Sequence, residues 1–336
     1  METCYRSLFI IYYLFSIIYY LTKCLRNHIG ASDNRYFGGA TIMTERSKAV
    51  KIEHKASREG RLSSFLKEEM GMSTGLMNRL KWQEKLFVNG TPQHTDYTVH
   101  IGDVITVPLD EETPQYPGEN DPITVLYEDE HMLAVDKPAG MLIHPSRSRL
   151  TGTLANRVLG YYQRTGQNSA FHPITRLDRD TFGIVLLAKN SHIHRLLQNV
   201  DMVKTYHALT FGGPEEDTGI IDAPIARRPL PSLLRFVSPE GKPSLTEFTV
   251  LERQENICKL ALRPVTGRTH QLRVHCAYMG YPVLGDPQYG SEDSANLSQQ
   301  LGLQSQCLCA KTLEFIHPIT AERLCLQSKM EACLDK

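Results

Sequence analysis

The sequence predicts an α+β protein built from two domains. Between residues 122 and 328, short helical patterns and short strands joined by turns follow one another without strict alternation, which favours α+β over a doubly wound sheet. Residues 58–108 form a smaller segment with two helical patterns and a β-ribbon. The 336 residues leave room for both, and 41% hydrophobic and 22% charged residues are typical of a globular protein.

The first residues do not match the rest of the chain. Residues 8–21 are Leu, Ile, Phe and Tyr interrupted only by Ser16, which is shorter than the roughly 20 residues needed to span a bilayer. No small-x-small cleavage site follows, and Met43 begins a polar stretch. We interpret residues 1–42 as a hydrophobic leader outside the functional fold and residues 43–57 as flexible. A membrane anchor and a disordered or packing extension are the alternatives.

Residues 58–108 have the pattern of a small α/β domain. Ser73 or Thr74 can cap the second helix, Asn89-Gly90 is a strong hairpin signal, and residues 101–107 read as a returning strand. The helical faces are Leu62, Phe65, Leu66 and Met70 in the first pattern and Leu76, Met77 and Leu80 in the second. This order resembles the αL-type RNA-binding module of a small-subunit ribosomal protein. A helical cap on the larger domain is the alternative.

The larger domain follows an acidic, proline-containing linker at residues 109–121. Its predicted elements, in order, are a strand at 132–135, a helix marked by Leu154, Val158 and Tyr161 and closed by Gly166, a buried strand at 184–188, a helix at 193–200, and strands at 206–211, 246–251 and 258–263. No internal repeat is evident, so we expect one catalytic or binding domain at residues 122–328.

Two stretches of charge stand out within this domain. In the first, H-P-I-T-R-L-D-R-D-T at residues 172–181, Asp178 lies between Arg176 and Arg179 just before an apolar strand. A carboxylate beside a guanidinium can be held ionised at the edge of a buried strand. The second, residues 263–275, carries three arginines and no acid. A surface loop with local ion pairs is the plain alternative for the first stretch.

Together these stretches resemble the RluA-type family of pseudouridine synthases. The resemblance extends to E-D-E-H-M-L-A-V-D-K-P-A-G at residues 128–140, to K-T-Y at residues 204–206, and to Gly285-Asp286 with Tyr289-Gly290. It covers roughly residues 122–328 in the family's order. It implies a mixed, largely antiparallel central sheet flanked by helices, and an isomerase that converts uridine in RNA to pseudouridine. That reaction changes no redox state and loses no group, so no cofactor is expected.

The resemblance also assigns candidate residues. Asp178 matches the acid that acts at the ribose, and Tyr206 matches the tyrosine at the uracil. Arg268 is the candidate for orienting Asp178, with Arg273 in reserve, and phosphate binding is the alternative for either arginine. Nine side chains are expected to bind RNA: Arg176, Arg179, Lys204, His270, Gln271 and Arg273 near the acid, and Arg61, Arg79 and Lys81 in the first domain.

Several observations leave alternatives open. Thr175 stands where the family usually has His or Asn, and Phe182 where it usually has Ser, so a catalytically decayed RNA-binding protein is the runner-up. A glycosidase would need a second carboxylate paired with Asp178. His270 and His275 lack a third ligand for zinc at a sensible spacing. The neighbouring histidines His192 and His194 are interpreted as surface residues.

Charge and cysteine content bound the partners and the compartment. The net charge is zero, so no general positive field indicates a nucleic-acid partner, which counts mildly against RNA. It does not exclude RNA, because an RNA-binding enzyme needs positive charge only along its binding track, and residues 263–275 are purely basic. Eight cysteines form no convincing disulfide or zinc framework, which predicts reduced thiols and a cytoplasmic protein. We expect a monomer that acts on large-subunit ribosomal RNA or transfer RNA and contacts no membrane.

Overall fold

The computed structural model describes residues 51–109, 114–146, 148–229 and 231–332. The predicted leader at residues 1–42, and residues 43–50 of the predicted flexible stretch, lie outside the described residues. In the described ranges, no helix is both long enough and apolar enough to cross a membrane.

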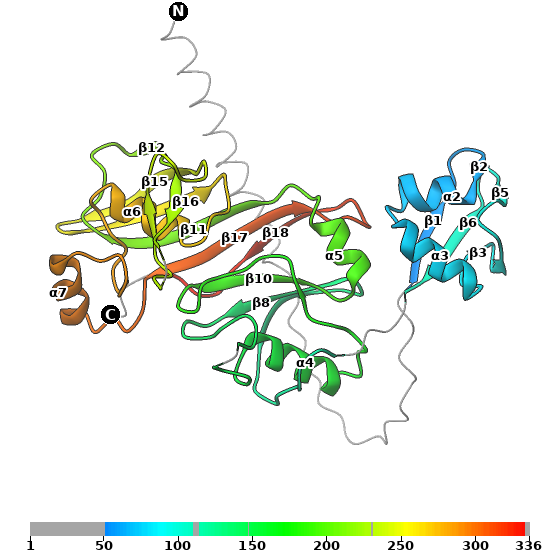
Figure 1. The fold of residues 1–336 in the computed structure, drawn as a ribbon, viewed down its shortest axis with the longest axis horizontal. Helices are drawn as coiled ribbons and strands as arrows, with labels where there is room; N and C mark the ends of the chain where they lie inside the picture. Colours follow the sequence, from blue (N-terminus) through cyan, green and yellow to red (C-terminus); the bar gives the residue numbers. More distant parts are fainter. Residues whose placement is uncertain (1–50, 110–113, 147, 230, 333–336) are drawn as a thin grey trace, which may run out of the picture. The chain divides into compact units, whose positions relative to one another are not determined.

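The N-terminal module contains the elements that its sequence predicts (Figure 1). Its helical part consists of α2 (Leu62–Ser64), η1 (Phe65–Glu69) and α3 (Thr74–Trp82). Ser73 caps α3, since its side chain accepts a hydrogen bond from the backbone N–H of Leu76. The strands are β1 (Lys51–Lys55), β2 (Gly60–Arg61), β3 (Phe87–Val88), β4 (Thr91–Pro92), β5 (Thr98–Val99) and β6 (Val104–Pro108). The predicted hairpin at Asn89-Gly90 joins β3 to β4.

One predicted boundary of this module is wrong. Residues 51–55 were expected to be flexible, but they form β1 and pair along their whole length with β6. Ile52 of β1 is buried, as are Ile105 and Val107 of β6. This strand is easily missed in the sequence, because Ile52 is its one apolar residue and the other four are polar or charged.

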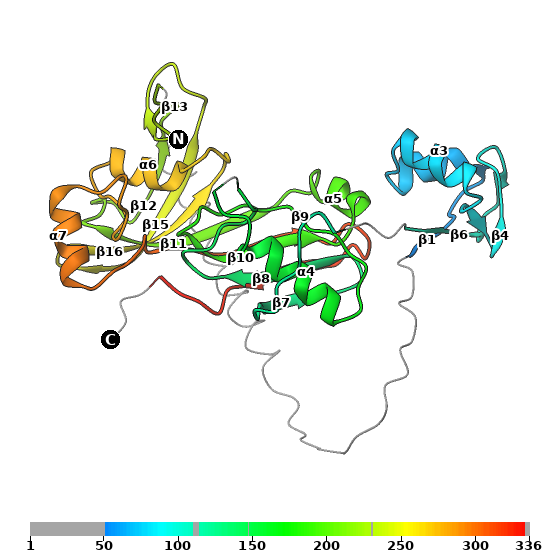
Figure 2. The same cartoon turned by 60° about the horizontal axis from the view of Figure 1, so that its bottom comes forward.

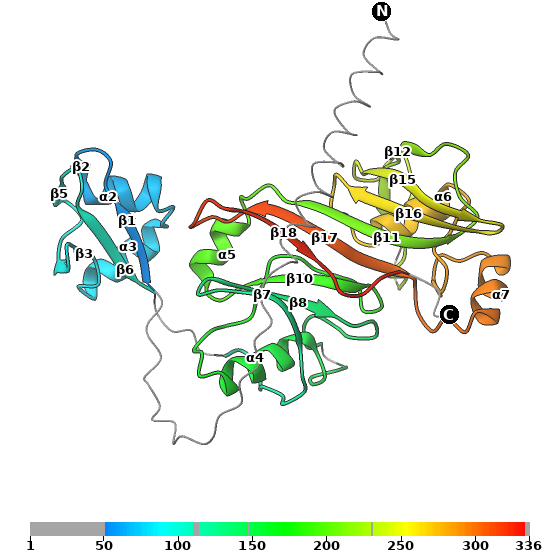
Figure 3. The same ribbon diagram turned by 180° about the vertical axis from the view of Figure 1, so that it is seen from behind.

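The larger domain, from residue 122 onward, is organised around a ten-stranded sheet (Figure 3). Its main order is β12-β15-β16-β11-β17-β10-β8-β7, with β18 beside β17 and β9 beside β10. The bounds are β7 (Thr124–Glu128), β8 (Met132–Lys137), β9 (His172–Pro173), β10 (Phe182–Ala188), β11 (Val203–Phe211), β12 (Thr218–Asp222), β15 (Leu245–Gln254), β16 (Ile257–Pro264), β17 (Leu308–Ile316) and β18 (Arg323–Gln327). All pairs are antiparallel except β10 with β17. The predicted mixed, largely antiparallel sheet is therefore confirmed.

Helices cover both faces of the β8–β10 half. Helix α4 (Leu154–Arg164) contributes Leu154, Val158 and Tyr162 to a cluster with alternate residues of β8 and β10. The other alternate residues of these strands pack with Ile193 and Leu197 of α5 (Ser191–Leu197). Because both strand faces are covered, β8 and β10 are apolar nearly throughout.

Helices also frame the other half of the sheet. Helix α6 (Gln271–Tyr278) packs Leu272 and Cys276 with residues of β11 and β16. Helix α7 (Glu292–Gln300) contacts β11. A hairpin of β13 (Ile225–Arg227) and β14 (Arg235–Val237) projects near α6 (Figure 2).

Close backbone approach fixes the β10–β17 junction. Gly183 has φ +107°, and a Cβ atom there would lie 2.4 Å from the backbone oxygen of Ala310. Only glycine fits both constraints, so the glycine after Phe182 sets where β10 joins its parallel neighbour β17.

The predicted end of the domain at residue 328 is slightly early. Met330 and Ala332 pack against the cluster that includes Leu209 and Cys309.

The prediction that His192 is a surface residue is wrong. His192 lies in the first turn of α5 and is buried, and neither ring nitrogen has a hydrogen-bond partner. Burial lowers the pKa of His192 to about 4, so the ring is neutral near pH 7. A seven-residue helix gives too little periodicity to show which of its faces is covered.

Candidate active site

The loop that carries Asp178 runs from β9 to β10 and is tied down at three points. The Thr175 hydroxyl accepts a hydrogen bond from the N–H of Leu186 in β10, 2.9 Å away. Thr181 accepts a hydrogen bond from the Gln306 side chain, 2.6 Å away, just before β17. Between these points, Lys137 donates to the carbonyl of Arg179 at 2.9 Å. The loop is therefore fixed on both sides of the acid.

Lys137 is fully buried at the end of β8. Its ammonium donates to three backbone carbonyls, those of Pro138, Met141 and Arg179, at 2.9 to 3.0 Å. Burial lowers the pKa of Lys137 to about 8, and the nearby carboxylates of Asp180 and Asp178 oppose that shift. Because all three N–H groups of its ammonium are hydrogen-bonded, Lys137 ties the loop after β8 to the loop that carries Asp178.

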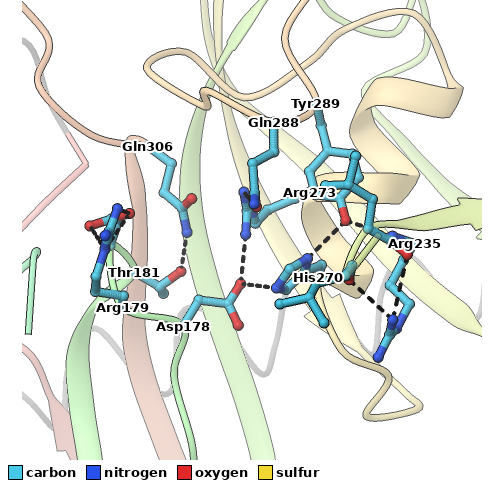
Figure 4. Close-up of polar contacts among 12 residues, drawn as sticks. Asp178, Arg179, Thr181, Arg235, His270, Arg273, Gln288, Tyr289 and Gln306 are labelled. Atoms are coloured by element: carbon cyan, nitrogen blue, oxygen red, sulfur yellow. Dashed lines mark hydrogen bonds and ion pairs between the residues drawn. The ribbon is translucent and has the colours of Figure 1, made fainter. Parts of the chain in front are cut away.

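Asp178 faces α6 and pairs with Arg273 (Figure 4). Its Oδ2 accepts a hydrogen bond from Arg273 Nη1 at 3.0 Å, and Nε2 of His270 lies 3.8 Å from the same oxygen. Among the described residues, no group donates a hydrogen bond to Oδ1. The side chain is 29% exposed. One carboxylate oxygen is thus held by a cation, and the other is available to a substrate.

Arg273 is itself held by a second, fully buried carboxylate. Its Nε and Nη2 donate to Asp286 at 2.7 and 2.8 Å, and Nη2 also donates to Gln288 at 2.8 Å. Its guanidinium carbon lies 4.9 Å from the centre of the Tyr289 ring. The side chains of Arg273 and Asp286 are 5% and 0% exposed. The arginine is therefore presented to Asp178 in one fixed orientation.

These contacts bear on three sequence-based assignments. Arg268 does not orient Asp178: it lies on the exposed loop before α6 and donates to the carbonyl of Pro243 at 3.1 Å. Arg273 makes the contact with Asp178 instead, and its side chain is 5% exposed. Gln271 is also buried and uses all four of its hydrogen-bonding positions within the protein. Its side-chain amide donates to Leu245 and Thr246 and so ties the start of α6 to β15.

A cleft of about 470 Å³ opens on one side of Asp178. Tyr206 of β11 lines it, beside a bulge in the pairing of β11 with β17. Burial, with a contribution from Asp178, raises the pKa of Tyr206 to about 12, so its hydroxyl is protonated near pH 7. Arg176, Lys204 and Arg268 line the same cleft. The predicted acid and tyrosine therefore share one cavity.

A second hollow of about 510 Å³ adjoins the first. Asp178, His270 and Arg273 line both, and the second adds Arg179, Arg227 and Arg235. Arg179 is paired in bidentate fashion with Asp180, through Nε to Oδ1 at 3.0 Å and Nη2 to Oδ2 at 2.8 Å.

The remaining predicted RNA-binding residues differ in setting. Arg176 is exposed, and Lys204 is half-buried in the cleft, where burial lowers its pKa. Arg61, Arg79 and Lys81 are exposed on the N-terminal module, as is Trp82, which is 84% exposed. His275 is buried and its two ring nitrogens bond Thr246 and Ala223, which leaves none for a metal.

Sequence reasoning missed the supporting residues Lys137, Asp286 and Tyr289. All three stand in the segments that carry the family resemblance, but no role was given to them. One signal was present for Asp286. Residues 263–275 carry three arginines and no acid. If one of these arginines is buried, its charge needs a carboxylate from another segment, and Asp286 is the nearest acid that follows in the sequence.

Comparisons with known proteins identify the family to which the chain belongs. A family model described as RNA pseudouridylate synthase matches residues 131–278. The uncharacterized RNA pseudouridine synthase YjbO of Bacillus subtilis is 36% identical over 263 residues, covering 76% of this chain and 90% of its own. Ribosomal large subunit pseudouridine synthase C of Vibrio cholerae is 30% identical, covering 82% of this chain and 91% of its own.

A solved structure also matches. The structure titled human RNA pseudouridylate synthase domain containing 1 is 26% identical with a TM-score of 0.52, and the match covers 64% of this chain and 86% of that chain. The matches to the two bacterial relatives span about nine tenths of each relative's own length. The region matched by the family model contains Asp178, Tyr206 and Arg273. The chain therefore belongs to the RluA-type family of RNA pseudouridine synthases, isomerases that convert uridine in RNA to pseudouridine.

Proposed function

We propose that Asp178 acts at the ribose of the target uridine through Oδ1, while Arg273 holds Oδ2. The observation that carries this proposal is the chain of ion pairs from Asp178 through Arg273 to the buried Asp286, at the wall of the cleft that Tyr206 lines. This arrangement fixes the carboxylate before substrate arrives, which is the kind of preorganisation that lowers a barrier.

The reaction needs a carboxylate here because of where charge develops. Breaking the bond between ribose and N1 of uracil builds positive charge at the anomeric carbon, which a carboxylate can stabilise or attack. The detached uracil must then turn within the cleft and rejoin through C5. We assign Tyr206 to the uracil, as a ring that packs against the base and a protonated hydroxyl that can donate to it.

The cations at the cleft point to how RNA is held. Arg176, Lys204 and Arg268 line the cavity beside Asp178, and no carboxylate is bonded to any of them among the described residues. We therefore propose that they contact the phosphates on either side of the flipped uridine. For Arg268 this adopts the phosphate-binding alternative that the sequence had left open.

The Asp178→Asn variant tests the assignment. The change is nearly isosteric, and Arg273 keeps Asp286, so folding and RNA affinity should be close to normal. Pseudouridine formation should fall by at least about a thousandfold, or roughly 4 kcal/mol of barrier. Activity within tenfold of the wild type would refute the role of Asp178. If neither protein forms pseudouridine on any RNA tested, the catalytically decayed binder would be favoured.

We further propose that the N-terminal module binds RNA and that the substrate lies in large-subunit ribosomal RNA. Exposed Arg61, Arg79 and Lys81 support the first point, and the names of relatives such as the Vibrio cholerae synthase support the second. Mapping pseudouridines in total RNA from a deletion strain and its parent distinguishes ribosomal from transfer RNA.

Two further expectations concern the state of the protein in the cell. Buried cysteines at positions 258, 276 and 309 carry free thiols, which supports a reducing compartment, and we propose the cytoplasm. A monomer is proposed as well, and sedimentation of the purified protein at micromolar concentration tests it.

A further inference from the structure

His270 occupies an unusual position next to the acid. It is the residue immediately before α6 and adopts φ +58°, in the left-handed region that non-glycine residues seldom enter. Its side chain is 17% exposed, and it lines both hollows that meet at Asp178. Strained residues of this kind are found at functional sites, where the surrounding structure holds them in place.

The two ring nitrogens of His270 face different partners (Figure 4). Nδ1 lies 2.8 Å from the hydroxyl of Tyr289, and Nε2 lies 3.8 Å from Oδ2 of Asp178. The Tyr289 hydroxyl also accepts a hydrogen bond from the backbone N–H of Arg235 in β14, 2.9 Å away. The acid, the histidine, the tyrosine and the β13–β14 hairpin are therefore linked in one row.

The geometry selects one tautomer of the ring. Because the N–H of Arg235 can only donate, the Tyr289 oxygen accepts there and is free to donate its own proton to Nδ1. An Nδ1 that accepts leaves the ring proton on Nε2, which points toward the Asp178 carboxylate. The opposite tautomer would direct a lone pair at a negative oxygen and leave the tyrosine proton unpaired, so both ends of the row favour Nε2–H.

The charges around the ring are mixed. Asp178 and Asp286 favour a protonated imidazole, whereas burial, which is the largest effect, and the cations of Arg273 and Arg235 disfavour it. Together they lower the pKa of His270. The ring is therefore neutral near pH 7, and its single N–H is the group that Tyr289 directs.

We propose that Tyr289 and His270 are positioning residues that select which oxygen of Asp178 reacts. In this arrangement the His270 Nε2–H joins the Arg273 guanidinium on Oδ2, and Oδ1 is left as the oxygen that meets the ribose. The 3.8 Å separation is too long for a hydrogen bond in this structure, so the proposal requires Nε2 and Oδ2 to come closer when substrate binds. The proposal rests on the role of Asp178 proposed above.

The tautomer can be observed directly. In protein labelled with ¹⁵N-histidine, long-range ¹H–¹⁵N correlation spectra distinguish an Nε2–H ring from an Nδ1–H ring. The chain has 13 histidines, and the His270→Asn variant identifies the His270 signals by their loss. Asparagine tolerates the left-handed backbone, so this variant should fold. We expect Nε2–H in the wild type and a mixture in Tyr289→Phe. Nδ1–H in the wild type would overturn the proposal.

A double-mutant cycle tests whether the pair acts on catalysis. Single-turnover rates at saturating RNA are measured for Tyr289→Phe, His270→Asn and the double variant. Each single variant should lose roughly tenfold to hundredfold in rate, as expected when a reacting group is misplaced. The double variant should be little slower than His270→Asn alone, because Tyr289 works through His270. Effects that multiply independently, or no effect in either single variant, would overturn the proposal.

Two controls complete the experiment. Tyr278→Phe removes a hydroxyl from an exposed tyrosine at the end of α6, which makes no contact in the row of Asp178, His270 and Tyr289. This variant should leave the rate unchanged. The Asp178→Asn variant distinguishes this proposal from the proposed role of Asp178, on which it rests. If Asp178→Asn is fully active, the role of the acid fails. If Asp178→Asn is inactive but the cycle shows independent effects, only the role of His270 and Tyr289 fails.

Discussion

Replacing Asp286 with asparagine should destabilise the catalytic domain far more than the same replacement at Asp178. Both carboxylates bind Arg273, but Asp286 is fully buried and makes two hydrogen bonds to the guanidinium, whereas Asp178 is 29% exposed and makes one. In Asp286→Asn, an amide N–H group replaces one accepting oxygen and the buried arginine loses its neutralising charge.

The size of the effect follows from that burial. Breaking a buried ion pair by removing one partner costs about 3–5 kcal/mol. Asparagine keeps one oxygen, which can still accept from the backbone N–H groups of Gln288 and Tyr289, so we expect the lower end, about 3 kcal/mol. For Asp178→Asn, the partly exposed pair should contribute about 1 kcal/mol or less.

Urea unfolding followed by circular dichroism measures the difference. Tryptophan fluorescence would not serve, because the chain's one tryptophan, Trp82, lies in the N-terminal module. With a slope of about 3 kcal/mol per molar urea, Asp286→Asn should lower the midpoint by roughly 1 M and Asp178→Asn by at most about 0.3 M. Equal shifts in the two variants would refute the reasoning. Replacing both Arg273 and Asp286 with apolar residues should recover part of the loss.

Three further outcomes are expected. Arg268→Ala should raise the apparent Michaelis constant for RNA and spare the turnover number, since its side chain bonds a backbone carbonyl rather than Asp178; a collapse of turnover would contradict this. Single-stranded RNA should quench the fluorescence of Trp82, and added salt should reverse the quenching; no change would argue against RNA binding by the module. His192→Phe should protect against acid. The pKa of His192 is about 4 in the fold and 6.5 unfolded, so its contribution to the free energy of unfolding is complete above about pH 6.5 and falls by about 3 kcal/mol as the pH drops to 4. Equal acid sensitivity of both proteins would exclude His192 as its source.

The order of helices and strands could be predicted because the local patterns are strong. The helical faces of the N-terminal module, the Asn89-Gly90 hairpin and the buried strand β10 all rest on spacings within one segment. The parallel pairing of β10 with β17 could not be predicted from spacing. It joins Gly183 to Ala310, and nothing local to either residue reveals that contact.

The site was predicted in part for the same reason. Asp178 and Tyr206 each stand in a recognisable motif, and both line the cleft. The choice between Arg268 and Arg273 depended on where α6 begins. His270 enters the left-handed region and the helix starts at Gln271, which turns Arg273 inward and leaves Arg268 on the loop. The backbone conformation at His270 therefore decides which arginine can reach Asp178. The types of the side chains do not reveal that conformation.

The position of β17 in the sheet has a consequence for folding during synthesis. During synthesis the Asp178 loop emerges with β10, but its anchor Gln306 and its neighbouring strand β17 are made more than a hundred residues later. Arg273 and Asp286 also follow in that interval. A chain still being translated therefore carries Asp178 before the residues that contact it have been made. We expect the candidate active site to be completed only after β17 has been synthesised and has paired with β10.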